Sequence, residues 1–368
     1  MSVKSLRLLV DIGHPAHVHL FRNAIRIWLE RGHSLAITIR DKDLTAELLS
    51  LYGFQFSVAS KARNGSFGLA VELLEHNWGV LNSALRHRSQ ILLGTSVSIT
   101  HVARLIGAKS IVFSEDDADV ARTFVRLTYP YAHTIVTPTC LNEDHGRKHV
   151  TYRGYQKLAY LHPNQFTPDH SVLDKMGVKR GEPYFVIRLV SLQAAHDAGE
   201  SGIKISTLGR LLQVLTKKGK VFITSEKPLL PEFDHYRISI PVTDIHHALF
   251  YATLFIGDSQ SMALEAAVLG TPAIRFNTFA KRCSALLELE HQYGLTFGFQ
   301  PVEEDRMLAK VDELLNTNNL RGCWQEKRKV MLSDMIDVTP WMVNFVENYP
   351  SSLYKYQRNK HGSKTIIY

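Results

Sequence analysis

The stretch of sequence that decides the fold is FIGDSQSMALEAAVLGTPAI, which runs from Phe255 to Ile274. It opens with a short apolar run typical of a buried strand, continues through a small polar loop, and then shows the spacing of a helix over residues 261–269. Gly270 is placed to end that helix, and a second apolar run starts at Ala273. A strand, a short helix and another strand at this spacing predict a parallel sheet in an α/β domain.

The start of that helix is a candidate anion site, because the first N–H groups of a helix lack intrahelical partners and lie at the positive end of its dipole. Ser259, Gln260 and Ser261 form this start, and the serine hydroxyls add donors for a diphosphate. Glu265 lies four residues after Ser261 on the same helix face, where a carboxylate can accept both hydroxyls of a ribose. The alternative is that Ser259 only caps the helix and Glu265 is solvated. Close packing of a short, alanine-rich helix at the carboxyl edge of a sheet favours the ligand site.

Outward from this stretch, short apolar strands alternate with helical segments in two successive halves. The first half has predicted strands at 6–12, 34–39, 55–59, 91–94, 110–113 and 134–136, with its clearest helix at 17–31. The second half has predicted strands at 184–189, 220–224, 254–256 and 273–276, with helices at 204–217, 246–251, 261–269 and 280–291. Helix and strand breakers at 160–168 separate the halves. The pattern predicts Rossmann-like domains at 1–163 and 164–339, followed at 340–368 by a crossing helix and a basic tail.

Composition and charge limit the classes of protein that this chain can belong to. Its 368 residues are 45% hydrophobic, and its three cysteines are far apart and odd in number, which fits neither a disulfide framework nor a CxxC metal site. The first apolar run is too short for a signal peptide or a spanning helix, so we expect a cytoplasmic protein. Residues 1–157 carry 19 Lys and Arg against 13 Asp and Glu. This excess is either a solvated surface or a contact with acidic lipid headgroups or an anionic acceptor, and its lack of aromatic interleaving disfavours nucleic acid.

The stretch around Ser259 resembles the C-domain loop and helix of GT-B enzymes that use nucleotide sugars. These include MurG-type glycosyltransferases and non-hydrolysing UDP-N-acetylglucosamine 2-epimerases. The segments VDIGHPAHVHLFRNAI, FSEDDAD, RLTYPYAHTIVTP, YRGYQKLAYLHP and FVIRLVSLQAAHD resemble, in order, the domain-of-unknown-function family number 354 of the GT-B clan. The resemblance covers nearly the whole chain. It implies a GT-B fold, with two Rossmann-like domains whose parallel sheets face across a cleft and a C-terminal helix that crosses back to the first domain.

The loop after the first strand carries candidate acceptor-site residues. His14 is expected at the carboxyl edge of the sheet, where its imidazole can take a proton from an acceptor hydroxyl; the alternative is that it caps the next helix. His17 is expected mainly to cap that helix, and Arg22 to reach a phosphate. His17 and His19 point to different sides of a helix, so we expect no metal site here.

A second group of candidates lies in the acidic loop after the fifth strand. Glu115, Asp116 and Asp117 either stabilise the dipole of a following helix or supply an acid or base, because the similarly placed loop of the 2-epimerases carries a catalytic carboxylate. Asp117 and Asp119 also match the DxD pattern of metal-dependent transferases. We reject that match because two Rossmann-like halves surround it, and in such folds helix starts and cations commonly replace the metal.

The remaining candidates lie in the second half. Arg188 ends a predicted strand and can neutralise a departing diphosphate, and His196 and Asp197 can contact the sugar. The GT-B resemblance implies that Ile245 contacts the nucleobase through its backbone. The 2-epimerases carry a His-Arg-x-Glu-Asn run near Arg188 that this chain lacks, which counts against epimerisation.

These observations together predict a metal-independent glycosyltransferase of cell-surface polysaccharide or glycolipid biosynthesis. Its expected partners are a nucleotide-sugar donor, implied to be UDP-linked, and a glycan or lipid-linked acceptor, with peripheral contact to an anionic membrane. We expect no cofactor, and no G-x-G-x-x-G follows the first strand of either half, which disfavours nicotinamide chemistry. The alternatives are a nucleotide-sugar epimerase or hydrolase, and a noncatalytic sugar-nucleotide-binding subunit.

Overall fold

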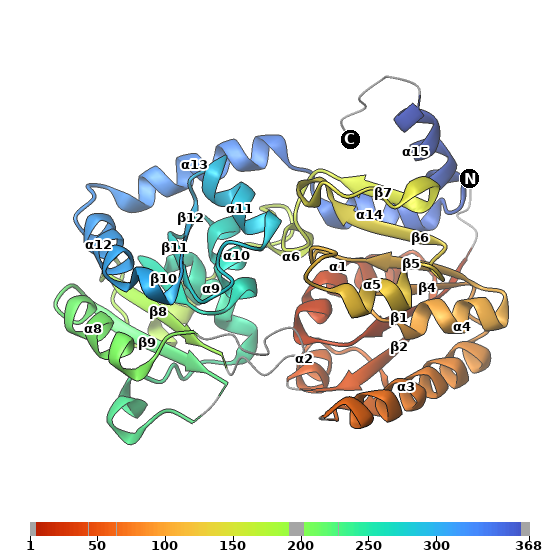
Figure 1. The fold of residues 1–368 in the computed structure, drawn as a ribbon, viewed down its shortest axis with the longest axis horizontal. Coiled ribbons are helices and arrows are strands. Elements are labelled where there is room, and N and C mark those ends of the chain that lie inside the picture. The colour runs from red at the N-terminus through yellow and green to blue at the C-terminus, as the bar shows by residue number, and fades with distance from the viewer. Residues whose placement is uncertain (1–4, 43, 64, 191–201, 227, 362–368) are drawn as a thin grey trace. The chain divides into compact units, whose positions relative to one another are not determined.

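The computed structural model of the chain describes residues 5–42, 44–63, 65–190, 202–226 and 228–361. These residues divide into two compact units (Figure 1). Unit 1 runs up to Gln165 and resumes at Ile336, whereas unit 2 is the continuous segment Phe166–Met335. The domain boundaries predicted after residues 163 and 339 lie within a few residues of these division points.

Unit 1 is built on a seven-stranded parallel sheet with the strand order β3-β2-β1-β4-β5-β6-β7. Its strands are β1 (Arg7–Ile12), β2 (Ser34–Asp41), β3 (Ser57–Lys61), β4 (Ile91–Gly94), β5 (Lys109–Phe113), β6 (Thr134–Pro138) and β7 (His149–Tyr152). The central strand β1 is fully buried from Leu8 to Ile12, which is typical of a parallel sheet covered on both faces.

Helices and short 3-10 turns complete unit 1. They are α1 (Pro15–Glu30), α2 (Thr45–Leu51), α3 (Gly65–His87), α4 (Ser98–Ile106), α5 (Arg122–Thr128), α6 (Leu158–Leu161), α14 (Val338–Glu347), α15 (Ser351–His361), η1 (Thr139–Leu141) and η2 (Gly146–Lys148). Helices α3 and α4 pack side by side, and their apolar residues share one core with Leu9, Leu92 and Val112 of the sheet (Figure 1). Helix α1 packs against α6 and α14.

Unit 2 repeats this architecture on a five-stranded parallel sheet with the order β12-β11-β10-β8-β9. Its strands are β8 (Tyr184–Leu189), β9 (Lys220–Ser225), β10 (Leu254–Gly257), β11 (Ala273–Phe276) and β12 (Thr296–Phe299). Its helices and 3-10 turns are α7 (Ser171–Lys175), α8 (Ile205–Leu215), α9 (Ile245–Tyr251), α10 (Gln260–Leu269), α11 (Ser284–His291), α12 (Glu304–Leu315), α13 (Leu320–Asp334), η3 (Pro231–Tyr236), η4 (Val242–Asp244) and η5 (Pro301–Glu303).

The predicted fold class, two Rossmann-like α/β units, is confirmed, and the C-terminal helix α14 belongs to unit 1 as predicted. Strands β7 and β12 are missing from the prediction, because each has four residues and neither is a continuous apolar run. The helix predicted to begin at His17 begins at Pro15. Helix α5 begins at Arg122, so residues 114–119 form a loop and do not open a helix. Within the described ranges, no helix is both long and apolar enough to span a bilayer.

Candidate functional site

Each sheet reverses its strand order once, and predicted site residues follow the strands that flank each reversal. In unit 1 the order reverses between β1 and β4, and in unit 2 between β8 and β10. Open α/β sheets bind ligands outside the carboxyl ends of their strands at such points. His14 and His17 follow β1, Arg188 lies at the end of β8, and Ser259 follows β10. The topology therefore brings candidates that are distant in sequence to one position in each unit.

The start of α10 has the geometry of a capped helix. Ser259 is the N-cap, and its Oγ accepts the Met262 N–H at 3.3 Å. Gln260 and Ser261 form the first turn and are half-buried. At the other end, Gly270 has a φ of 75° and ends the helix in the left-handed conformation. The Ser259 hydroxyl thus caps the helix, while the first-turn N–H groups lie at the positive end of the helix dipole.

Three buried polar atoms at the start of α10 and at the end of the neighbouring strand β8 have no hydrogen-bond partner among the residues that the structure describes. They are Oε1 of Gln260, Oδ1 of Asn277 and Nε of Arg188. Asn277 is fully buried, and its Nδ2 donates to the Asp258 carbonyl at 2.9 Å. The Arg188 guanidinium donates to Thr224 Oγ1 at 2.9 Å and to Glu226 Oε1 at 2.6 Å. Because buried polar atoms are nearly always hydrogen-bonded, this cluster is consistent with a polar ligand.

Glu265 lies one turn further along α10 and contacts a histidine of α9. Its Oε1 is 3.2 Å from Nε2 of His246, and both side chains are buried. The solvated carboxylate of the alternative interpretation is therefore wrong. Ile245, the predicted nucleobase contact, is half-buried and is the first residue of α9, directly before His246. The contact places Glu265 beside the first turn of α9, which contains Ile245.

Asp258 accepts hydrogen bonds from two backbone groups, one directly after β8 and one shortly before α8. Its Oδ1 accepts the Val190 N–H at 2.8 Å, and its Oδ2 accepts the Ile203 N–H at 3.4 Å. Burial raises the pKa of Asp258 to about 6, although the hydrogen bonds from these backbone groups oppose that shift. A single carboxylate thus contacts both Val190 and Ile203. The predicted sugar contacts His196 and Asp197 lie outside the described residues.

At the corresponding edge of unit 1, His14 and His17 have different environments. His14 is exposed at the N-cap of α1, and its Nδ1 accepts the Ala16 N–H at 3.2 Å. His17 was expected to be this cap, but it lies inside the helix with Nδ1 2.6 Å from Thr95 Oγ1. Burial, together with the nearby His14 and Lys157, lowers the pKa of His17 to about 3. His17 is therefore a neutral hydrogen-bonding group at neutral pH and a weak base.

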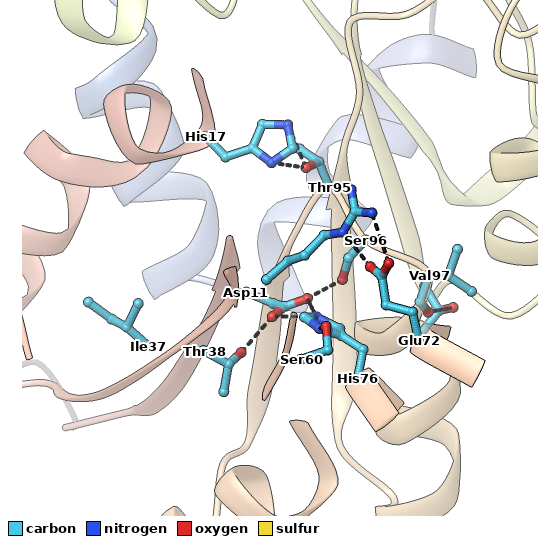
Figure 2. A network of polar contacts seen from close by, with 12 residues as sticks. Asp11, His17, Ile37, Thr38, Ser60, Glu72, His76, Thr95, Ser96 and Val97 are labelled. Atoms are coloured by element: carbon cyan, nitrogen blue, oxygen red, sulfur yellow. Dashed lines mark hydrogen bonds and ion pairs between the residues drawn. The ribbon is translucent and has the colours of Figure 1, made fainter. Parts of the chain in front are cut away.

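Beneath this edge, the buried carboxylate of Asp11 links β1 to β2 and to the turn after β4 by hydrogen bonds (Figure 2). Asp11 is fully buried and accepts hydrogen bonds from Thr38 Oγ1 at 2.6 Å, from Ser96 Oγ, and from His76 Nε2 at 2.9 Å. The other ring nitrogen of His76 is 2.8 Å from Ser60 Oγ. Ser96 is adjacent to Thr95, the partner of His17, so Asp11 fixes the turn that positions His17.

Asp11 and His76 each favour the charged form of the other. Burial works against the charged form of each, yet the attraction between the two outweighs it. The pKa of Asp11 is therefore lowered and the pKa of His76 is raised. This pair is absent from the sequence-based candidates, but one signal was available. A carboxylate within the apolar run of β1 must be paired if that strand is buried on both faces.

Of the three acidic candidates after β5, Glu115 is the one that joins this edge. Its Oε2 is 2.9 Å from Lys157 Nζ in a nearly buried ion pair, and it also accepts the Gln156 N–H. Asp116 is exposed, and Asp117 is buried with its carbonyl accepting the N–H groups at 120 and 121. The charge of Lys157 also contributes to the lowered pKa of His17.

Arg22 is held among aromatic side chains of unit 1. Its guanidinium donates to Tyr52 Oη, lies 3.3 Å from His19 Nδ1, and is 4.9 Å from the centre of the Tyr52 ring. Its predicted contact with a phosphate would require these contacts to loosen. No cluster of three or more His, Cys, Asp or Glu side chains in the described ranges could hold a metal ion.

Comparisons with known proteins give a family match and a set of structural neighbours. A model of the family described as "protein of unknown function (DUF354)" matches residues 6–351. An uncharacterized protein of Methanocaldococcus jannaschii is 23% identical over 288 residues, which are 73% of this chain and 81% of that protein.

Two solved structures illustrate the structural likeness. The UDP-GlcNAc 2-epimerase of Neisseria meningitidis bound to UDP-GlcNAc has a TM-score of 0.58 and 11% identity, over 89% of this chain and 98% of that chain. The SsfS6 glycosyltransferase of Streptomyces sp. SF2575 has a TM-score of 0.61 and 13% identity, over 93% of this chain and all of that chain (100%). At these identities the likeness shows a shared fold.

Proposed function

This chain belongs to the DUF354 family of proteins of unknown function, and we propose that it is a glycosyltransferase. It transfers a sugar from a nucleotide-sugar donor to an acceptor, and its own cationic groups serve in place of a metal ion. The observation that carries the proposal is that three buried polar atoms have no partner among the described residues: those of Gln260 and Asn277 beside the start of α10, and that of Arg188 at the end of the neighbouring strand β8.

Unit 2 binds the donor in this proposal. The first-turn N–H groups of α10 and the Ser261 hydroxyl bind the diphosphate, and Arg188 neutralises the charge that develops as the nucleoside diphosphate leaves. Glu265 accepts the ribose hydroxyls. His246 acts as a positioning residue, because its contact at 3.2 Å fixes the direction of the Glu265 carboxylate. The backbone at Ile245 contacts the base, and the solved structure with UDP-GlcNAc supports a UDP-linked donor.

Unit 1 binds the acceptor, and His14 takes the proton from its hydroxyl group. In the neutral ring, Nδ1 of His14 accepts the Ala16 N–H, so Nε2 carries the proton. Base catalysis therefore requires this capping bond to open. At 3.2 Å the bond is at the long end of the usual range, which makes opening inexpensive. Glu115 is already paired with Lys157, which supports a role for that pair in shaping the edge.

Nucleotide binding is tested first, by thermal shift with a panel of nucleoside diphosphates. A ligand at 100 times its dissociation constant stabilises the folded state by about 2.7 kcal/mol, which for a unit of this size raises Tm by roughly 5–10 °C. Glu265→Gln keeps a carbonyl oxygen towards His246 but removes the charge. We expect it to lose most of the shift, measured against the unliganded Tm of the same variant, which should fall because a buried contact with His246 loses its charge.

The matched control is Glu326→Gln, which makes the same change at an exposed position of α13 in the same unit. This variant should keep the full shift. A full shift in Glu265→Gln would show that the nucleotide binds elsewhere.

The reaction is then followed by mass spectrometry with the donor and candidate glycan or lipid-linked acceptors. Release of nucleoside diphosphate in step with glycosylated product, unaffected by a chelator, supports the proposal. Complete dependence on a divalent ion would contradict the metal-free reaction.

An epimerase is the second candidate, because one structural neighbour is a 2-epimerase bound to UDP-GlcNAc. Epimerised donor formed without acceptor would favour this candidate over the transferase.

A further inference from the structure

Helix α3 carries an apolar stripe on its outer surface. Phe67, Leu74, Trp78 and Leu85 are 84%, 70%, 65% and 54% exposed. They are spaced by seven, four and seven residues, which places them on one face of the helix. Apolar residues at this spacing usually lie on the face of a helix that packs against a core. Here, no residue of the described chain covers this face. We call these four residues the α3 stripe.

The opposite face of α3 is tightly packed, so the stripe is not the loose side of a poorly anchored helix. Val80 and Ala84 are fully buried in the core beneath it. A side chain at Gly79 would meet the backbone of Ala59 in β3 at 2.5 Å, so the helix approaches the sheet as closely as a glycine allows. The backbone that presents the stripe is therefore fixed by the fold.

The apolar surface continues onto the neighbouring helix. Leu105 of α4 is 72% exposed and lines a groove together with Leu74, Trp78 and Leu81. The exposed Tyr131 ring packs edge-on against His101 of α4, with the ring centroids 5.0 Å apart. Figure 1 shows α3 along the outer edge of unit 1 with α4 beside it.

The charge around this surface is mainly positive. Residues 76–114, which include the second half of α3 and all of α4, contain four Lys and Arg and no Asp or Glu. Arg86, Arg88, Arg104 and Lys109 are all exposed. The nearest acid on α3, Glu75, is paired with Arg63 at 2.6 Å. A second copy of this surface would place like charges opposite each other, which disfavours self-association.

We propose that the α3 stripe and Leu105 bind an anionic membrane surface. Tryptophan and leucine side chains enter the boundary between headgroups and acyl chains, while the surrounding arginines contact acidic headgroups. Trp78 lies midway along the stripe, and tryptophan favours this interface because its ring is both apolar and polar. The proposal concerns unit 1 alone and does not depend on the sugar-transfer chemistry.

Vesicle co-sedimentation of the full chain tests the surface without any donor or acceptor. We expect binding to phosphatidylcholine vesicles that contain phosphatidylglycerol, weak binding to phosphatidylcholine alone, and release at high salt as screening shortens the reach of the charges. Leu74→Ser with Trp78→Ser should weaken binding about tenfold or more, because two large apolar side chains lose their burial. The matched control is Val302→Ser with Val330→Ser, which changes two exposed apolar residues of unit 2 and should bind as the wild type does.

The charge component is tested separately. Arg86→Gln with Arg104→Gln should weaken binding roughly fivefold for each arginine removed. The matched control is Arg180→Gln with Lys217→Gln, which removes the same charge from exposed positions of unit 2.

The depth to which Trp78 enters the membrane is tested by quenching of tryptophan fluorescence with brominated lipids. The quenching should disappear in Trp78→Phe, which keeps an apolar ring and should still bind.

Several outcomes would overturn the proposal. These are no binding to acidic vesicles at low salt, equal binding to both lipid compositions, and unchanged binding of the Leu74→Ser and Trp78→Ser variant with its Tm retained. A wild-type dimer in analytical ultracentrifugation that this same variant dissociates would assign the surface to self-association instead.

Discussion

The buried pair of Asp11 and His76 gives the sharpest test of what holds unit 1 together. Asp11→Asn keeps the shape of the side chain but removes the negative charge that binds groups of β2, α3 and the turn after β4. Breaking a buried ion pair by removing one partner costs about 3–5 kcal/mol, because the other group keeps its desolvation without its attraction. Asp11 is fully buried and accepts hydrogen bonds from Thr38 Oγ1 at 2.6 Å and from His76 Nε2 at 2.9 Å. We therefore expect Asp11→Asn to lower the free energy of unfolding by about 3–5 kcal/mol.

Hydrogen exchange read by mass spectrometry is the suitable assay, because a chain of two units need not melt in a single transition. Peptides that contain β1 should exchange roughly 100- to 5000-fold faster in Asp11→Asn, at 1.4 kcal/mol for each factor of ten. Peptides from β10 in unit 2 serve as the internal control and should be unchanged. Thr38→Val removes one hydroxyl donor and keeps the ion pair, so it should cost only about 1 kcal/mol.

The pH dependence separates the charge effect from simple loss of packing. The pKa of His76 is raised above 6.5, so its contribution to stability is complete below pH 6.5 and is lost as pH rises through the folded-state pKa. The pKa of Asp11 is lowered below 3.8, so its contribution is present above pH 3.8 and is lost as pH falls through the folded-state pKa. Asp11→Asn should abolish the decline above pH 6.5. Wild-type protection of β1 in this variant, or an unchanged pH slope, would refute the reasoning.

Three further predictions concern other buried or capping groups. Burial raises the pKa of Asp258 from 3.8 to about 6, so the stability of unit 2 should decline as pH rises across that window, and Asp258→Asn should flatten the decline in a pH series of Tm values. Lys157→Gln leaves the nearly buried Glu115 carboxylate without its ammonium partner and should destabilise unit 1 by about 3–5 kcal/mol, whereas adding Glu115→Gln should restore much of the loss in urea unfolding. His14→Asn can still cap α1, so it should keep the wild-type Tm and lose turnover. His14→Ala should lose turnover and also lower the free energy of unfolding by about 1 kcal/mol, because the cap is lost. Turnover by His14→Asn would exclude a catalytic base at this position.

The fold was predictable because it depends on local patterns. Runs such as 184–189 and 273–276 appear in the structure with the same bounds, because buried parallel strands are continuous apolar segments between turns. The loop of Ser259 was predictable for the same reason, since a strand, a polar loop and a helix are adjacent in sequence. Capping of α1 was expected mainly from His17, with His14 only as an alternative, and the structure makes His14 the cap, because the fixed φ of Pro15 favours the first position of a helix.

The partners of the buried groups were not predictable, because they come from distant segments. Nothing local pairs His76 with Asp11, or His246 with Glu265, and these contacts follow from how helices pack on the sheets. The α3 stripe was also missed. Its spacing is that of any helix with a buried face, and only the exposed fractions show that this face is uncovered.

The division of unit 1 into two chain segments affects the order in which the protein can fold during synthesis. Helix α14 packs on α1 and α6, and Thr339 Oγ1 donates to the Ala159 carbonyl at 2.6 Å in a buried site. Glu347 also binds His33 at 3.0 Å. Unit 2 is continuous and leaves the ribosome before α14 does, so it can complete its core while unit 1 still exposes the α1 surface that α14 will cover. The first domain to be translated is thus the last to be finished, and a chain that stops at Met335 should yield a folded unit 2 beside an unfinished unit 1 that is prone to aggregation.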